Sequence, residues 1–162
     1  MKSNDPAISP AFEPLVDAVL SASRVLVAVA ARSIAGVGDD VTLPQYRTLV
    51  VLASRGPQSL AGLAEAIGVT SATATRMCDR LVRKGLIRRR SERDDRRQIR
   101  VGLTAQGRDL VETVTNKRRQ EIAHIVQDIP MDERAIVVQA LNRLTTAAGE
   151  VPEQDWTTGW DL

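Results

Sequence analysis

The sequence predicts a mainly α-helical protein that carries one small β-hairpin. Three observations predict this fold class. Apolar residues recur at helical spacing over most of the 162 residues. Two short amphipathic segments are joined by a glycine, Gly68. After Gly85, two short alternating segments at residues 86–90 and 98–103 flank a charged turn. A chain of this length can bury a core without disulfides or metal.

The N-terminal part predicts two helices. From Pro14 to about Ala35 the apolar residues recur at roughly helical spacing, and the sequence GVGDD closes this segment. Thr42 then precedes Pro44, a proline well placed in a first helical turn. An apolar stripe follows, and residues 55–57 (Arg-Gly-Pro) end the second helix.

The next stretch, SLAGLAEAIGVTSATATRMCDRLVRKG, predicts a helix-turn-helix. Ser59 can cap a short helix, Gly68 supplies the turn, and a second helix starts near residues 70–71. The predicted buried stripe of the second helix has the spacing i, i+3, i+4, i+7 and consists of Ala74, Met77, Cys78 and Leu81. Its other side is small, hydroxylic and basic, with Ser71, Thr73, Thr75, Arg76, Asp79, Arg80 and Arg83.

The run RRRSERDDRRQIRVGLT, which begins at Arg88, predicts a basic hairpin. Ten of its seventeen residues are charged. Strand alternation places Ile99, Val101 and Leu103 against the helices, so the arginine-rich tip points outward. Helix, turn, helix and basic hairpin in that order describe a winged helix.

The C-terminal part predicts two more helices and a tail. Thr104 can cap a long helix, and Pro130 separates it from a last one. The tail VPEQDWTTGWDL holds both tryptophans. Two interpretations of this tail stay open: it packs on the helices or on a partner subunit, or it is a loose extension.

Charge is distributed unevenly along the chain. The net charge is +2, yet residues 71–100 carry 11 basic and 4 acidic side chains, while the segments before and after are net acidic. Such a cluster is the electrostatic footprint expected for nucleic acid. On the second helix of the pair, short Ser and Thr side chains permit close approach to a duplex. Arg76 and Arg80 can reach guanine edges or phosphates.

The sequence lacks the residues and motifs that several other classes of function require. The single Cys78 and the single His124 cannot form a disulfide or a histidine cluster, so we expect no metal and no cofactor. No Gly-rich phosphate loop or nucleophile motif is present, which predicts that the protein is not an enzyme. The N-terminus lacks an apolar secretory segment, and the apolar run at residues 25–31 is too short to span a bilayer. We therefore expect a soluble cytoplasmic protein with no membrane partner.

From about Leu15 to Leu144 the sequence resembles the MarR family of winged-helix transcription regulators. The strongest elements are LPQYRTLVVLASRGPQSLAGLAEAIGVTSATATRMCDRLVRKGLI and DDRRQIRVGLTAQGR. The latter carries an Asp-x-Arg pattern at Asp95 and Arg97. It also carries a Leu-Thr-x-x-Gly junction at Leu103, Thr104 and Gly107.

The resemblance implies a homodimer in which the terminal helices of both chains interlock. Residues 1–38 would be an N-terminal dimerisation helix with a flexible start, residues 39–104 a DNA-binding lobe, and residues 105–162 the C-terminal dimerisation helices and tail. The implied recognition helix enters the major groove with Ser71, Ala72, Thr73, Thr75, Arg76 and Arg80. Arg97 would enter the minor groove, oriented by Asp95. The implied phosphate contacts are Arg88, Arg89, Arg90, Arg93 and Arg96.

The expected function is sequence-specific regulation of transcription on double-stranded DNA. The resemblance implies a repressor of a pseudo-palindromic operator, released by a small aromatic or phenolic ligand. The alternative is a winged-helix module used only for protein contacts. Tyr46 and Arg47 lie near the position of the family's pocket, although Tyr46 is better interpreted as a core tyrosine with a satisfied hydroxyl. Cys78 is interpreted as structural, because family members that sense peroxide place the reactive thiol in the first helix.

Overall fold

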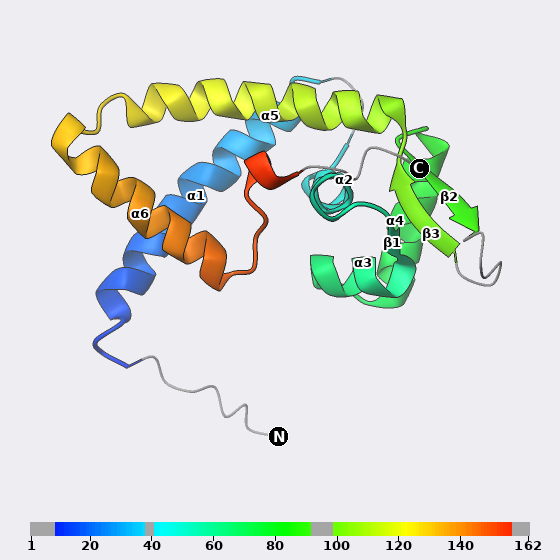
Figure 1. The fold of residues 1–162 in the computed structure, drawn as a ribbon, viewed down its shortest axis with the longest axis horizontal. Coiled ribbons are helices and arrows are strands. Elements are labelled where there is room, and N and C mark those ends of the chain that lie inside the picture. The colour runs from blue at the N-terminus through cyan, green and yellow to red at the C-terminus, as the bar shows by residue number, and fades with distance from the viewer. Residues whose placement is uncertain (1–8, 38–40, 92–98, 157–162) are drawn as a thin grey trace.

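The computed structural model describes residues 9–37, 41–91 and 99–156. Figure 1 shows α2, α3, α4 and the strands at one end, with α1 and α6 at the other, and α5 running between the two ends. We call the group formed by α2 to α4 and the strands the winged lobe. The elements of the described chain are α1 (Glu13–Ala35), α2 (Leu43–Arg55), β1 (Gln58–Ser59), α3 (Leu60–Ile67), α4 (Ser71–Arg83), β2 (Ile87–Ser91), β3 (Ile99–Leu103), α5 (Ala105–Val126), α6 (Met131–Ala147) and the short 3₁₀ helix η1 (Glu153–Asp155).

Side-chain caps fix the starts of α2 to α5. In each case a hydroxyl accepts a hydrogen bond from the backbone N–H three residues further on, which satisfies one of the free donors of the first helical turn. The capping residues are Thr42, Ser59, Thr70 and Thr104. Gly68 ends α3 with a φ of 70°, a left-handed conformation that glycine adopts without strain. The predicted positions of these helices and of the turn are confirmed.

The strands form an antiparallel sheet in the order β1-β3-β2. The hairpin of β2 and β3 pairs Ile87 with Leu103 and Arg89 with Val101. The edge strand β1 pairs Gln58 with Val101 and was not predicted, because two residues are too few to show strand alternation. With β1 on one side and β2 on the other, β3 is the central strand of the sheet.

The prediction for the side chains of β3 is right at Val101 and Leu103 and wrong at Ile99. Val101 is 0% exposed and Leu103 is 3% exposed, whereas Ile99 is 46% exposed. Ile99 lies at the outer end of the strand, opposite Ser91. Alternation assigns a side chain to a face of the sheet, but it does not say how far along the strand the helices cover that face.

The core of the winged lobe is built from all of its helices and the sheet. Leu49, Leu63, Leu81, Leu86 and Val101 are completely buried. Burying a side chain of this kind contributes about 1.5–3 kcal/mol relative to leaving it exposed. The first half of α5 packs on the same core, with its side chains Leu110, Val111 and Val114. The core therefore joins the long helix rigidly to the winged lobe.

Two individual predictions for buried residues are confirmed. Tyr46 is 2% exposed, and its hydroxyl lies 3.3 Å from Oγ1 of Thr115 on α5. Cys78 is 0% exposed and belongs to the apolar side of α4. Burial raises the pKa of the Cys78 thiol, so it stays protonated and behaves as a small apolar side chain.

The opposite end of the described chain leaves large apolar side chains in contact with solvent. No residue of α6 is buried within the described chain. The exposed apolar side chains of α6 are Met131, Ile136, Val138, Leu141 and Leu144, and those of α1 are Leu15, Leu20, Val25, Leu26 and Val27. By length and composition, α1 could also cross a membrane, although core helices of soluble proteins and signal sequences pass the same test. An exposed apolar surface of this extent is typical of an interface.

Candidate nucleic-acid interface

Helix α4 has one buried face and one exposed polar face. Ala74, Cys78 and Leu81 are buried. Met77 is only half-buried, and its sulfur lies 2.8 Å from Oγ1 of Thr48, whose hydroxyl also donates to the carbonyl of Pro44. On the outer face the predicted contact residues Ser71, Ala72, Arg76 and Arg80 are exposed, and Thr73 and Thr75 are half-buried. The structure therefore brings these six residues together on one accessible surface.

The hydroxyl groups at the start of α4 are organised by local hydrogen bonds. The Thr70 hydroxyl donates to Oγ1 of Thr73 over 3.0 Å, and the Thr75 hydroxyl donates to the carbonyl of Ser71 over 2.8 Å. Thr75 has thereby used its only proton, so it can offer an approaching base only an acceptor. In the major groove, such an acceptor suits the amino groups of adenine and cytosine.

An ion pair connects α4 to the hairpin. Nη2 of Arg89 on β2 lies 2.6 Å from Oδ1 of Asp79 on α4. The sequence predicts Asp79 on the outer face and Arg89 among the phosphate contacts, but no local pattern in it predicts this pair. Because both side chains are partly exposed, the pair contributes little to stability. The pair is a direct side-chain link between β2 of the hairpin and α4.

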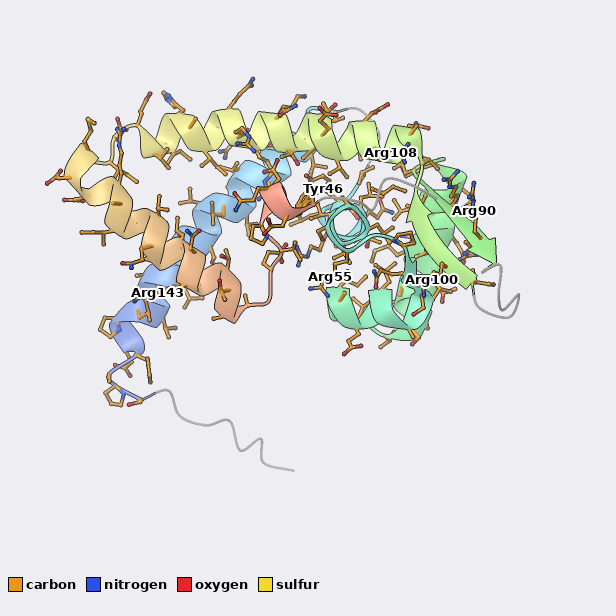
Figure 2. The ribbon with its side chains drawn as sticks, viewed as in Figure 1. Tyr46, Arg55, Arg90, Arg100, Arg108 and Arg143 are labelled. Atoms are coloured by element: carbon orange, nitrogen blue, oxygen red, sulfur yellow. The ribbon has the colours of Figure 1, made fainter. Side chains whose placement is uncertain are left out.

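The described part of the hairpin carries further positive charge. On β2, Arg90 is exposed and Arg88 is half-buried. Arg90 lies directly opposite Arg100 of β3 in the register of the hairpin. Figure 2 shows Arg90 and Arg100 on the wing, at the end of the molecule far from Arg143 on α6. The wing-tip residues of the prediction lie outside the described residues: Arg93, Asp95, Arg96 and Arg97.

A cavity lies between α2, α5 and the segment that follows α6, and we call it the α2–α5 cavity. Its volume is about 600 Å³. Its charged lining consists of Arg47, Arg118, Arg119, Glu150 and Glu153, and its apolar lining includes Val50, Ile122, Val126 and Trp156. Arg47 forms a two-pronged ion pair with Glu150, with N–O distances of 2.8 and 2.6 Å. The hydrogen bond from Arg47 holds the pKa of the Glu150 carboxyl below its usual range.

The Arg47–Glu150 pair predicts a pH-dependent contact. Because the folded pKa of Glu150 is lowered, the pair stabilises the folded chain above the usual carboxyl range and loses this contribution as pH falls through the lowered value. In a Trp160→Phe variant, Trp156 emission should change as the pH falls below the usual carboxyl range, where Glu150 takes up its proton. Adding Glu150→Gln should remove that component, and an identical titration in both variants would contradict the assignment.

Within the described chain, no group of three or more His, Cys, Asp or Glu side chains is placed to hold a metal ion. The surface formed by α4 and the hairpin is polar, positively charged and exposed, and it lies on a helix-turn-helix. These features define a winged helix-turn-helix protein.

Comparison with known proteins gives the family. A model of the MarR family matches residues 41–99. The fold is similar to that of RV1404 from Mycobacterium tuberculosis, with 45% identity, a TM-score of 0.83, and coverage of 90% of this chain and 99% of that one. YfiV of Bacillus subtilis, described as an HTH-type transcriptional regulator, is 26% identical over 70% of this chain and 75% of its own length. The chain belongs to the MarR family of transcriptional regulators.

A further solved relative is BpsR of Bordetella bronchiseptica. It is 26% identical, with a TM-score of 0.62, and the match covers 82% of this chain and 99% of BpsR. The DNA binding of BpsR is regulated by 6-hydroxynicotinic acid.

Proposed function

We propose that this regulator is a homodimeric repressor that binds a pseudo-palindromic operator in double-stranded DNA. The observation that carries the proposal is the exposed polar face of α4 beside a basic hairpin. An α-helix fits the major groove, where each base pair presents a distinct pattern of donors and acceptors. The cationic hairpin matches the phosphate backbone beside the groove.

Each predicted contact has a role in the proposal. On α4, the major-groove contacts are Ser71, Ala72, Thr73, Thr75, Arg76 and Arg80. On the hairpin, the phosphate contacts are Arg88, Arg90, Arg93 and Arg96. Arg97 enters the minor groove, where Asp95 orients it, because a narrow groove concentrates negative potential. Arg89 is proposed as a support of the wing through Asp79, with phosphate contact secondary.

The second copy of the chain is proposed to cover α1 and α6. An amphipathic helix in water is stabilised mainly by packing of its apolar face, and α6 has no buried residue in the described chain to supply this. In the proposed division, residues 1–38 and 105–162 serve dimerisation and residues 39–104 bind DNA. A two-fold axis would then present two copies of α4 to successive major grooves.

Selection of bound DNA from a random pool tests the proposal. We expect a palindrome whose half-site centres lie about 10 base pairs, or a multiple, apart. Failure to enrich any sequence would favour the alternative, a winged-helix module used only for protein contacts. A gel-shift series separates the two further, because a DNA-binding dimer that neutralises several phosphates should lose about 10³-fold or more in affinity from low to moderate salt.

Arg76→Ala should weaken binding to the selected operator by about 1–3 kcal/mol and relax the preference at one position of each half-site. Arg76 is exposed on the outer face of α4, where its guanidinium can reach a guanine edge. Competition gel shifts with single-base operator variants measure this. If all sequences weaken equally, Arg76 contacts phosphate instead.

A small aromatic or phenolic ligand is proposed to release the repressor from DNA. The α2–α5 cavity supports this, because its volume of about 600 Å³ and its mixed apolar and cationic lining suit a small organic anion. The ligand that regulates BpsR is such a molecule and is a reasonable first compound to test. A ligand shifts the lobes only by its difference in affinity for the two states. We propose action in the cytoplasm, without a cofactor or a membrane partner.

A further inference from the structure

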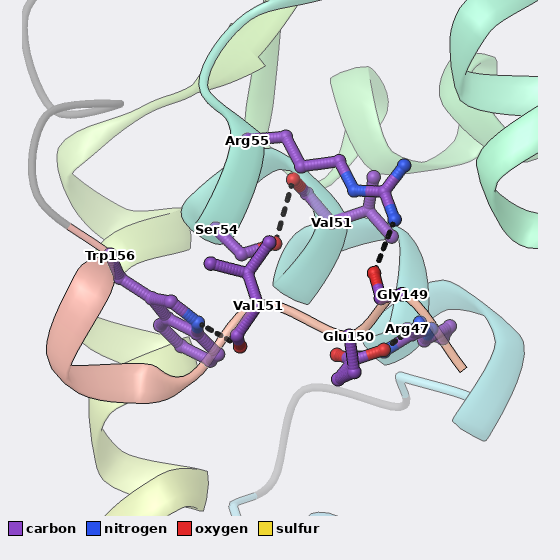
Figure 3. A network of polar contacts seen from close by, with 8 residues as sticks. All are labelled: Arg47, Val51, Ser54, Arg55, Gly149, Glu150, Val151 and Trp156. Carbon is purple, nitrogen blue, oxygen red and sulfur yellow. Dashed lines mark hydrogen bonds and ion pairs between the residues drawn. The ribbon is translucent and has the colours of Figure 1, made fainter. Parts of the chain in front are cut away.

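The segment Gly149–Trp156, which we call the C-terminal strap, returns from α6 to the winged lobe and α5. Nη2 of Arg55 on α2 donates to the carbonyl of Gly149 over 3.4 Å, and Arg47 on α2 binds Glu150. Trp156 then packs against the core. Figure 3 shows this network along α2. The strap therefore connects the C-terminal end of α6 directly to α2.

The strap places carboxylates against the cationic side of the α2–α5 cavity. Both terminal nitrogens of Arg47 bind the two oxygens of Glu150, the parallel geometry by which Arg recognises a carboxylate. Glu153 binds Arg119 over 3.0 Å. Nε of Arg118, in the same lining, is buried with no hydrogen-bond partner among the described residues. The cavity lining thus contains three guanidinium groups and two carboxylates, both of which come from the strap. The lining therefore carries an excess of positive charge.

We propose that Glu150 is an internal competitor for small carboxylate ligands of the α2–α5 cavity, so that a ligand carboxylate that takes Arg47 releases the strap from α2. The carboxylate of Glu150 occupies the position on Arg47 that a free carboxylate would need, and Trp156 and Val50 supply an apolar wall for an aromatic body. The apparent affinity for such a ligand is then reduced by the fraction of chains in which Glu150 holds Arg47.

This proposal rests on the proposed function only for its effect on DNA. Release of the strap would remove the ties between α6, on the side proposed for dimerisation, and α2 of the DNA-binding lobe. Binding of the ligand and release of the strap can both be measured without DNA. A failure of this proposal is therefore distinguishable from a failure of DNA binding.

Benzoate titrations of the full chain carrying Trp160→Phe test the proposal, with Trp156 emission as the signal and uncharged benzamide as the matched probe. Adding Glu150→Gln should tighten benzoate binding roughly fivefold, because the competing charge is lost while the side chain keeps its length. Benzamide binding should not change. Glu133→Gln, which removes a carboxylate from the exposed start of α6, should leave both affinities unchanged.

Two further variants test the carboxylate and its arginine partner separately. Glu150→Asp retains the charge but is too short for the same two-pronged contact, and it should give an intermediate benzoate affinity. Arg47→Gln should abolish the preference for benzoate over benzamide. Equal benzoate affinity in the parent and in Glu150→Gln would overturn the proposal. The proposal would also be overturned if benzoate and benzamide bound equally well to the parent chain and equally well to Glu150→Gln. Absence of benzoate binding at millimolar concentration would overturn it too.

Discussion

Replacing Gly107 with alanine is expected to destabilise the protein by about 3 kcal/mol, because the added methyl group has no space. A Cβ at Gly107 would overlap the backbone carbonyl oxygen of Leu86 and would also lie 3.3 Å from Cδ2 of Leu103. The Leu86 carbonyl cannot easily move, since it accepts a hydrogen bond from the backbone N–H of Thr104 over 3.1 Å. The overlap would force apart the start of α5 and the entry to β2.

Gly62→Ala is the matched control for this prediction. Gly62 and Gly107 each occupy the third position of a helix and donate a backbone hydrogen bond to the capping hydroxyl, of Ser59 and Thr104 respectively. A Cβ at Gly62 would approach only side-chain atoms, the nearest at 3.3 Å. Its effect should lie within about 1 kcal/mol of zero, because alanine also favours the helix. Urea unfolding of both variants measures the difference, and equal losses would contradict the steric argument.

Leu141→Glu is expected to produce a monomer that loses specific DNA binding by about 10²-fold or more, because the two half-sites are no longer bound as a linked pair. Leu141 is 47% exposed on α6, so the substitution leaves the core of the single chain intact. In the proposed dimer, the new carboxylate would be buried without a partner, which is strongly unfavourable.

Light scattering after size-exclusion chromatography, followed by gel shifts on the selected operator, tests this prediction. Gln120→Glu on α5 introduces the same charge at an exposed polar position and should remain dimeric. A Leu141→Glu protein that is still dimeric and binds the operator with unchanged affinity would show that α6 does not form the interface.

The helix-turn-helix could be predicted from the sequence because its determinants are local. Ser59 and Thr70 cap helices three residues before their bonding partners, and Gly68 supplies the turn directly between the helices. The outer face of α4 follows from the same periodicity. Contacts of this kind depend only on residues that are close together in the chain, so they can be predicted from the sequence alone.

Other features could not be predicted because they depend on tertiary contacts. Arg47 and Glu150 are 103 residues apart, and nothing in their local sequence connects them. The pairing of Asp79 with Arg89 needs the angle between α4 and the hairpin. Gly107 belonged to a pattern of the resemblance, but its physical reason, the approach of Leu86, appears only in the fold. The assignments of Arg93, Asp95, Arg96 and Arg97 stay predictions.

The position of Trp156 shows that this part of the C-terminal tail packs on the protein. The sequence left the tail as either packed or loose. Trp156 packs against the core, and its indole N–H donates to the carbonyl of Val151 over 3.1 Å. Trp160 lies outside the described residues.

The uninterrupted course of α5 has a mechanical consequence. Its 22 residues span about 33 Å, from the base of the wing to the far end of the molecule. Because the first half of this rod is embedded in the core, the winged lobe must follow its direction. A tilt of about 10° would displace the other end by about 6 Å, a sizeable fraction of the roughly 34 Å between successive major grooves. A small angular adjustment where two chains meet would thus be amplified into a mismatch with the pitch of the double helix.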